Sequence, residues 1–309
     1  MHIRNYIWGI CYGLILAVFT GYVLLDTFVL KQVYSVAPSE GSRMADTDID
    51  AQEPKSRASD KETDVPVITD CSYEDGHISI AITEYREYHS AVYVADVRIS
   101  SAEYLQTAFA EGAYGKNVTE KTSAIAKRNS AILAINGDFY GTREKGYVLR
   151  DGIVYRSVSV RDQEDLVIYV DGSFAIITEH EVSTDELTAN GARQILSFGP
   201  ALVMDGSISV TENEEVGRAK ASNPRTAIGI IDELHYIFVV SDGRTAESEG
   251  LSLYELAEFM QSMGVVTAYN LDGGGSSTMY FNGRVINQPT TGGNRIQERS
   301  VSDIVFIGY

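Results

Sequence analysis

The chain has 309 residues, of which 44% are hydrophobic and 22% are charged, and its formal net charge is −18. This length and composition fit one large globular domain or two small ones. The acidic excess excludes the basic surface of a nucleic-acid-binding protein, although local arginines can still bind a phosphorylated ligand.

An almost wholly apolar segment opens the chain at residues 5–25. About 20 apolar residues suffice to cross a bilayer, whereas the apolar region of a cleaved signal peptide is usually about 7–15 residues long. We therefore predict an uncleaved, single-pass membrane anchor over residues 1–31, with a cleaved signal as the alternative. Arg4 precedes the span, which favours a cytoplasmic N-terminus and an extracytoplasmic C-terminal part.

A polar segment follows the predicted anchor. Residues 36–65 are rich in acidic side chains and poor in apolar ones, and such a stretch cannot bury enough surface to offset its ordering entropy. We predict a disordered stalk over residues 32–70 and a single domain over residues 71–309. The two cysteines, Cys11 and Cys71, fall in the anchor and at the start of this domain, so no internal disulfide is expected.

Strand patterns dominate the predicted domain, beginning with apolar or alternating runs at residues 77–82 and 92–99. Later runs are joined by Asp-Gly or Asn-Gly pairs, which favour tight hairpin turns. These pairs stand at residues 151–152, 171–172, 205–206 and 282–283, and further strand-like runs cover 226–231, 236–240 and 304–307.

Helices are fewer. Residues 253–263 place apolar side chains on one face, with Ser252 and Glu255 as a capping box. Two further helices are predicted at residues 119–129 and 101–110. The fold class is therefore α+β (mixed α/β): a strand-rich single domain with mixed sheets and few helices, preceded by a transmembrane helix.

Three apolar strands end in polar, glycine-rich sequence that carries a carboxylate: Asp138, Asp242 and Asp272. Sites gather at strand ends in sheet proteins, so these carboxylates are the candidate catalytic groups. Asp-Gly is also ordinary turn chemistry, which remains an alternative for Asp242. The sequence at Asp272 is longer and more polar than a tight turn requires, because three glycines and two serines follow the carboxylate.

The other candidate site residues are polar groups near these strand ends and contact substrate in our prediction. The glycines could expose N–H groups in an anion-binding turn, and arginine side chains bind phosphate or carboxylate oxygens. The predicted substrate-binding residues are Asn136, Arg225, Arg244, Asn270, Gly273, Gly274, Gly275, Ser276, Ser277 and Arg299.

Several common site motifs are missing from the sequence. It has no Gly-x-Ser-x-Gly elbow, no Cys/His metal spacing and no Walker loop, and its histidines lie outside the candidate segments. Carboxylates, hydroxyls and arginines remain, a set that suits glycoside or phosphodiester chemistry.

Six motifs, in order, resemble those of the phosphodiester glycosidase family, whose bacterial members are often labelled exopolysaccharide biosynthesis proteins. The motifs are Asn136–Tyr140, Gly199–Val203, Arg225–Gly229, Asp242–Arg244, Asn270–Thr278 and Glu298–Val301. The resemblance covers roughly residues 75–309. It implies hydrolysis of the bond between a sugar's anomeric carbon and a phosphodiester oxygen.

Our hypothesis is thus a membrane-anchored, extracytoplasmic hydrolase at a bacterial cell surface, acting on a phosphorylated glycan or exopolysaccharide. No cofactor is firmly predicted. One alternative is a metal-dependent phosphodiesterase, with Asp138, Asp242 and Asp272 gathered on Mg²⁺ or Ca²⁺. Another is a non-catalytic glycan-binding module at the cell surface.

Overall fold

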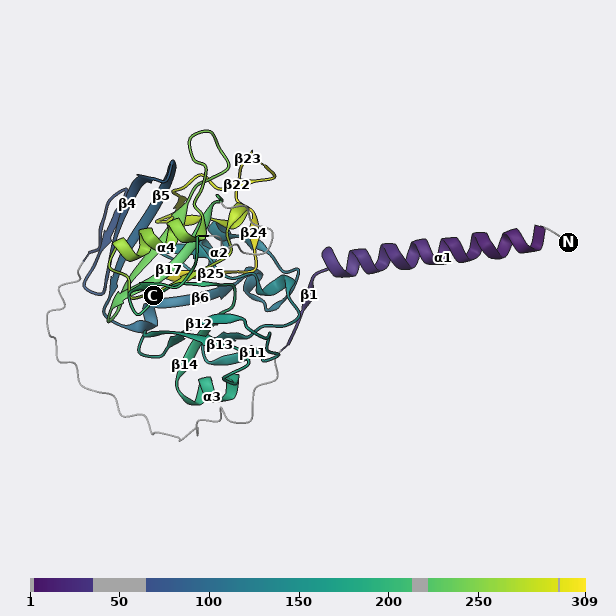
Figure 1. Ribbon diagram of the computed structural model, residues 1–309, viewed down its shortest axis with the longest axis horizontal. Coiled ribbons are helices and arrows are strands. Elements are labelled where there is room, and N and C mark those ends of the chain that lie inside the picture. Colours follow the sequence, from purple (N-terminus) through teal and green to yellow (C-terminus); the bar gives the residue numbers. More distant parts are fainter. Residues whose placement is uncertain (1–2, 36–64, 213–221, 294) are drawn as a thin grey trace, which may run out of the picture.

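The computed structural model describes residues 3–35, 65–212, 222–293 and 295–309. A long N-terminal helix, α1 (Ile3–Phe28), projects from a strand-rich body (Figure 1). Within α1, the 21 residues from Trp8 to Phe28 are long and apolar enough to cross a membrane, and none of them is buried against the body. By length and composition alone, this helix matches the predicted anchor.

The largest sheet has nine strands and forms one wall of the core. In spatial order its strands are β16 (Ser207–Ile208), β15 (Ala201–Met204), β19 (Thr267–Asn270), β17 (Arg225–Asp232), β18 (His235–Ser241), β5 (Ser90–Ile99), β4 (Ile78–Glu87), β3 (Ser72–Glu74) and β2 (Val67–Ile68). The predicted turns at 205–206 and 282–283 and the strands at 226–231 and 236–240 are confirmed.

Two five-stranded sheets complete the body. The first contains β21 (Arg284–Val285), β20 (Met279–Phe281), β9 (Leu133–Asn136), β25 (Asp303–Ile307) and β6 (Leu105–Phe109). The second contains β11 (Ile153–Arg156), β10 (Val148–Arg150), β14 (Ala192–Leu196), β12 (Glu164–Tyr169) and β13 (Phe174–Thr178). The hairpins predicted around residues 151–152 and 171–172 are β10–β11 and β12–β13.

The described part of the chain also forms three two-stranded ladders. They pair β1 (Gln32–Val33) with β7 (Gly115–Lys116), β8 (Glu120–Lys121) with β24 (Ser300–Val301), and β22 (Thr290–Thr291) with β23 (Arg295–Ile296). Every strand pair within the described residues is antiparallel. The strand-rich α+β class with few helices and a preceding helix is confirmed, but the sheets of the described residues are antiparallel where mixed sheets were predicted.

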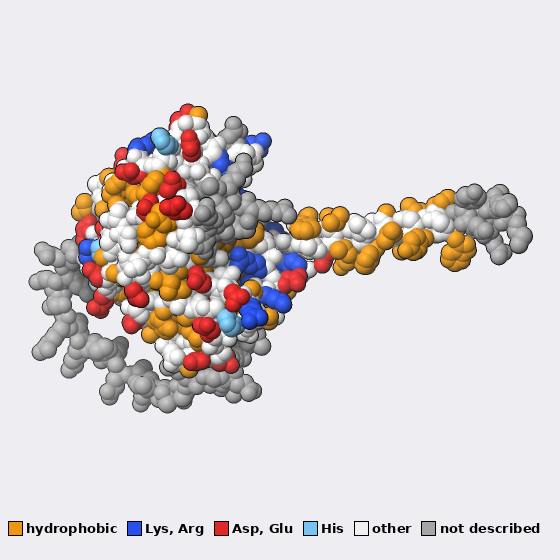
Figure 2. All heavy atoms as spheres, in the orientation of Figure 1, with side chains coloured by type: hydrophobic (Ala, Val, Ile, Leu, Met, Phe, Trp, Pro, Cys, Tyr) orange, Lys and Arg blue, Asp and Glu red, His pale blue; other side chains and the backbone are white. Residues whose placement is uncertain are grey.

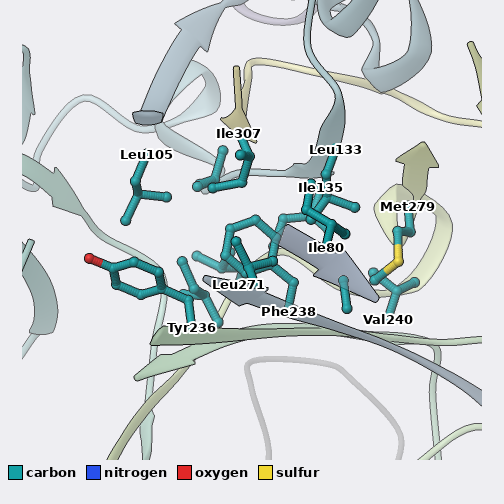
Figure 3. Packing of buried hydrophobic residues seen from close by; sticks show 14 of the residues in the cluster. Ile80, Leu105, Leu133, Ile135, Tyr236, Phe238, Val240, Leu271, Met279 and Ile307 are labelled. Carbon is teal, nitrogen blue, oxygen red and sulfur yellow. The ribbon is translucent and has the colours of Figure 1, made fainter. Parts of the chain in front are cut away.

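The main core fills the space between the nine-stranded sheet and the sheet that contains β9 (Figure 3). Along β18, Tyr236, Phe238 and Val240 face this core, while Ile237 and Val239 face the opposite side. This period of two is what a strand buried on both faces requires. Each large side chain buried in this way contributes about 1.5–3 kcal/mol.

Helices cover the outer faces of the sheets. The helix α4 (Leu253–Ser262) begins at the predicted Ser252–Glu255 capping box and packs on the nine-stranded sheet. The helix α2 (Thr122–Arg128) lies within the predicted 119–129 range, and α3 (Thr184–Ala189) covers the β14 sheet. Among the described residues there are also four short 3-10 segments: η1 (Ala102–Tyr104), η2 (Ala110–Gly112), η3 (Tyr140–Thr142) and η4 (Gly274–Ser276).

The helix predicted over residues 101–110 is wrong. Ser101 caps only the single turn η1, and the chain then enters β6, which pairs with β25. Leu105 and Thr107 are buried while Gln106 is half-buried, so the alternation of a sheet strand outweighs local helix propensity here.

Both described ends of the predicted 32–70 stalk contact the body. Residues 32–33 form β1 on β7, and residues 67–68 form β2 on β3. Residues 36–64, where most of the predicted disorder falls, lie outside the described residues.

Candidate active site

The loops that follow β9 and β19 meet at one end of the core, and Asn136 joins them. Its Nδ2 donates to the backbone oxygen of Asp272 at 2.6 Å, and its Oδ1 accepts from Thr226 Oγ1 at 2.8 Å and from Thr278 N at 3.2 Å. Asn136 is fully buried. It therefore positions the candidate carboxylate from behind, where direct substrate contact was expected.

Asp272 lies in the wall of a small cavity. Its Oδ2 accepts from Arg299 Nη2 at 2.7 Å and from Ser276 Oγ at 2.5 Å, and Arg299 Nε donates to Ser276 Oγ at 2.9 Å. Burial raises the pKa of the Asp272 carboxyl, and the charge of Arg299 opposes this rise. The carboxylate is thus fixed on one oxygen by a guanidinium and a hydroxyl.

The glycine turn after Asp272 serves mainly to let neighbouring groups approach. At Gly274, where φ is +63°, a Cβ would lie 2.7 Å from Arg244 Nη2, and at Gly273 it would lie 2.8 Å from the Pro224 oxygen. The N–H of Gly274 donates to Pro224 O at 2.8 Å, and the N–H groups of Ser276 and Ser277 bond within the turn. The prediction that this turn presents free N–H groups to an anion is therefore wrong for these three N–H groups, because they already donate to backbone oxygens.

Arginines supply the positive charge of the site. Arg244 adopts φ +63°, and its Nε and Nη2 donate to Asn223 Oδ1 at 3.2 and 3.0 Å. Burial lowers the pKa of Arg244, and the like charge of Arg299 lowers it further. Arg225 Nε donates to the Leu251 oxygen at 2.8 Å. Like charges held together in this way favour an anionic ligand.

The cavity that these groups enclose has a volume of about 160 Å³. It is lined by Phe198, Asn223, Arg225, Arg244, Asp272, Gly273, Gly274 and Arg299. A carboxylate thus stands beside several guanidinium groups, an arrangement that can hold a phosphate and act on an atom bonded to it.

The other two candidate carboxylates lie outside this lining. Asp138 is buried; its Oδ2 forms an ion pair with Arg150 at 3.0 Å and accepts from Ser197 N at 2.9 Å. Asp242 is also buried, and its Oδ1 accepts from Asn287 Nδ2 at 3.0 Å and from Gln288 N at 2.8 Å. Both carboxylates hold protein segments in place.

The alternative of three carboxylates gathered on a metal does not match the described side chains. Asp138, Asp242 and Asp272 have separate partners. Among the residues that the structure describes, no group of three or more His, Cys, Asp or Glu side chains could hold a metal ion.

The remaining predicted contacts are buried around the cavity. Asn270 Nδ2 donates to the Gly199 oxygen at 2.7 Å, Ser277 is fully buried, and Gly275 accepts at its oxygen from Arg299 N at 3.2 Å. These residues shape the turn that carries Asp272, and none of them lines the cavity.

Sequence reasoning missed several residues that the structure places at the site. Phe198 and Asn223 line the cavity, and Arg143 lies over the Phe198 ring at 5.5 Å. Behind the cavity, Arg150 also pairs with Asp303 at 2.6 Å. Asn223 stands two residues before the Arg225–Gly229 motif, a signal that could have marked it, and Phe198 directly precedes the Gly199–Val203 motif.

Known proteins share this architecture. The catalytic domain of zebrafish N-acetylglucosamine-1-phosphodiester alpha-N-acetylglucosaminidase, solved in a form auto-inhibited by its pro-peptide, superposes with a TM-score of 0.60 and 21% identity, covering 75% of this chain and 83% of that one. A hypothetical protein from Synechocystis superposes with a TM-score of 0.55 and 14% identity, covering 75% and 62%. At these identities the likeness concerns the fold.

Curated relatives match over part of their length. The SPbeta prophage-derived uncharacterized protein YomE of Bacillus subtilis is 30% identical over 203 residues, covering 63% of this chain and 31% of the relative. The mouse N-acetylglucosamine-1-phosphodiester alpha-N-acetylglucosaminidase is 33% identical over 175 residues, covering 51% and 33%. The chain therefore spans about one third of the length of the curated relatives it matches.

Residues 129–308 match the family model of phosphodiester glycosidases, and this range includes the turn that carries Asp272 and the arginines around it. The chain belongs to the phosphodiester glycosidase family of hydrolases.

Proposed function

We propose that this protein is a membrane-anchored, extracytoplasmic glycosidase that hydrolyses a sugar-1-phosphodiester bond in a cell-surface glycan or exopolysaccharide. The observation that carries the proposal is the position of Asp272 in a cavity that also exposes Arg225, Arg244 and Arg299. The name of the mouse relative describes a phosphodiester as its substrate, which agrees with this combination of a carboxylate and arginines.

The arginines would hold the phosphodiester. Arg244 is held by hydrogen bonds to Asn223, and Arg299 by Asp272 and Ser276. Guanidinium groups bind phosphate oxygens with directed, charge-assisted hydrogen bonds. Because the phosphate monoester that departs from the anomeric carbon is a good leaving group, the enzyme gains most by stabilising its charge, and a separate proton donor is unnecessary.

Asp272 would then act at the anomeric carbon. It is the carboxylate of the cavity lining, whereas Asp138 and Asp242 are held by protein groups elsewhere. Acting as a base, it would activate water and invert the anomeric centre; acting as a nucleophile, it would form a glycosyl-enzyme intermediate and retain it. The configuration of the first-formed sugar, followed by NMR, separates these two roles.

The anchor would place this chemistry at a membrane surface. The apolar stretch Trp8–Phe28 in α1 supports a single span, and the preceding Arg4 favours export of the domain. In this orientation the substrate would be a phosphorylated glycan outside the cytoplasm.

A turnover assay tests the proposal. The full chain in detergent micelles receives the methyl phosphodiester of N-acetylglucosamine 1-phosphate, and free sugar is measured with and without EDTA. Asp272→Asn keeps the side-chain size and removes the charge, and Asp205→Asn, in an exposed turn, is the matched control.

The expected result is sugar release that falls by at least about 100-fold in Asp272→Asn, persists in Asp205→Asn and does not change with EDTA. Loss of release with EDTA would support the metal-dependent alternative. If the protein bound a panel of labelled sugar-1-phosphodiesters without hydrolysing any of them, the glycan-binding module would be supported.

A further inference from the structure

A second cavity lies between the body and the segment that follows α1. It has a volume of about 360 Å³, and its lining includes Asp26, Gln32, Tyr114, Lys116, Arg143 and Arg156. Figure 2 shows Lys and Arg side chains gathered where α1 meets the body. On a chain with a net charge of −18, such a local cluster of cations needs an explanation.

Arg156 is the central cation of this cavity. Its Nε donates to the Gly146 oxygen at 2.6 Å, and its Nη1 donates to the oxygens of Tyr140, at 3.1 Å, and Arg143. Its Nη2 is buried and has no hydrogen-bond partner among the described residues. Backbone oxygens hold the guanidinium in place, but no described carboxylate lies within 4 Å to neutralise it.

Two more cations stand beside it. Arg143 donates from Nη1 to the Ser197 oxygen at 3.1 Å and, like Arg156, forms no ion pair with a described carboxylate. Lys116 pairs with Glu144 at 3.1 Å, but the Glu144 side chain is 81% exposed, so water weakens this pair. All three cations are half-buried, and Arg156 and Arg143 have no carboxylate within 4 Å among the described residues, so a bound anion would stabilise them.

Arg143 connects this cavity with the catalytic one. Its guanidinium lies over the ring of Phe198, which lines the cavity of Asp272, and its charge acts on the Asp272 carboxylate. The contact between Phe198 and Arg143 is therefore where a ligand with its phosphodiester at Asp272 would reach the second cavity.

The end of the anchor closes the other side of the second cavity. Asn117 Nδ2 donates to the oxygens of Thr27 and Leu30, and Tyr34 packs on Tyr114 with ring centroids 5.8 Å apart. At Gly115 a Cβ would collide with the Gln32 oxygen, so only glycine admits β1 this closely. The wall made by residues 26–34 is thus built into the fold.

From these observations we infer that the second cavity is an aglycone subsite, which binds a further phosphate group carried by the leaving half of the substrate. This inference rests on the proposed glycosidase function and names its substrate class: sugar-1-phosphodiesters whose aglycone bears a second phosphate. Arg156, Arg143 and Lys116 bind that phosphate.

Paired substrates test the subsite in the full chain. One N-acetylglucosamine 1-phosphodiester carries a two-carbon glycol with a terminal phosphate, the other the same glycol with a free hydroxyl, and a four-carbon pair covers a longer reach. The wild-type kcat/KM should be about tenfold higher for the phosphorylated aglycone, because one additional charge-assisted hydrogen bond stabilises the bound substrate by about that factor.

Arg156→Gln should abolish this preference while hydrolysis of the neutral substrate continues. The loss of Arg156 also leaves three backbone oxygens without their hydrogen-bond donor and can unfold the protein. Lys116→Gln is therefore a second variant, and it should reduce the preference for the phosphorylated aglycone. Arg161→Gln, whose side chain is 87% exposed, is the matched control and should keep the preference.

Binding of glycol monophosphate, followed by calorimetry, gives a readout that does not need turnover. Absence of hydrolysis of either substrate would refute the proposed function, while loss of glycol monophosphate binding in Arg156→Gln would still support the cavity as a phosphate site. Equal kcat/KM for both aglycones would refute the subsite and leave the glycosidase intact.

A last arm distinguishes the substrate from a membrane lipid as the source of the phosphate. The preference should be the same in phosphatidylcholine and phosphatidylglycerol nanodiscs. A preference that disappears only in phosphatidylglycerol would show that a lipid headgroup occupies the cavity, and would overturn its assignment to the aglycone.

Discussion

Gly274 is the residue whose replacement tests the cavity most directly. In Gly274→Ala the new Cβ would lie 2.7 Å from Arg244 Nη2 and 3.4 Å from its Cζ, so the guanidinium must move. Arg244 is held by two hydrogen bonds to Asn223 Oδ1, and the movement breaks that arrangement. The perturbation therefore removes one phosphate-binding arginine without altering any charge.

Two separate magnitudes follow from the structure. Alanine at φ +63° costs about 1–2 kcal/mol of folding stability, because its Cβ crowds the backbone in the left-handed region. Loss of one charge-assisted contact to the phosphate costs about 1.5–3 kcal/mol, which corresponds to about a 10- to 150-fold fall in kcat/KM.

A matched control separates the two effects. Gly206 has φ +73° and no heavy atom within 4 Å of a would-be Cβ. Gly206→Ala should lose a similar amount of stability in urea unfolding and retain full kcat/KM on the methyl phosphodiester. If Gly274→Ala kept half or more of the wild-type kcat/KM, or if both variants lost activity equally, Arg244 would not bind the phosphate as argued.

Three further changes have predictable outcomes. Burial, and then the charge of Glu179, raises the pKa of Asp165 well above its usual value, so the native state keeps a proton that the unfolded chain loses from about pH 4 upward. The free energy of unfolding should therefore fall as pH rises through the native pKa. Urea unfolding at pH 4.5 and 8 should show a smaller fall for Asp165→Asn than for the wild type. Arg150→Gln leaves two buried carboxylates without their cation and should cost about 3–5 kcal/mol in the same assay, and an unchanged unfolding midpoint would contradict the ion-pair geometry. Ser276→Ala removes a hydrogen bond to Asp272 and should lower kcat about tenfold with little change in melting temperature, whereas equal losses of both would indicate a structural role.

Local patterns predicted the parts of the fold that depend on neighbouring residues. The capping box at Ser252 and the Asp-Gly hairpins are encoded within a few positions, and the structure contains them. The helix predicted over residues 101–110 is wrong because this segment instead forms β6, which pairs with β25 about 200 positions away. No short-range pattern contains that contact.

The candidate site shows the same division. The sequence marks Asp272 by the glycines and serines that follow it, and the structure places it in the cavity wall. Asp138 looked equivalent, but its charge is matched by Arg150, which comes from β10. Whether a carboxylate faces a cavity or a buried arginine depends on tertiary packing, so sequence alone could not separate the two.

Unfavourable features concentrate at one point of this structure. Arg244 has a left-handed backbone, its guanidinium is partly desolvated beside Arg299, and Asp272 is a buried carboxylate. Each arrangement costs stability, and none of them is needed to join β18 or β19 to its neighbours. Asp272 pairs with Arg299, but Arg244 pairs with no carboxylate among the described residues, unlike Arg150, which pairs with two. Because the strain and the like charges meet around one cavity, a bound anion is the group that would relieve them, and the phosphate of a sugar-1-phosphodiester supplies that charge next to Asp272.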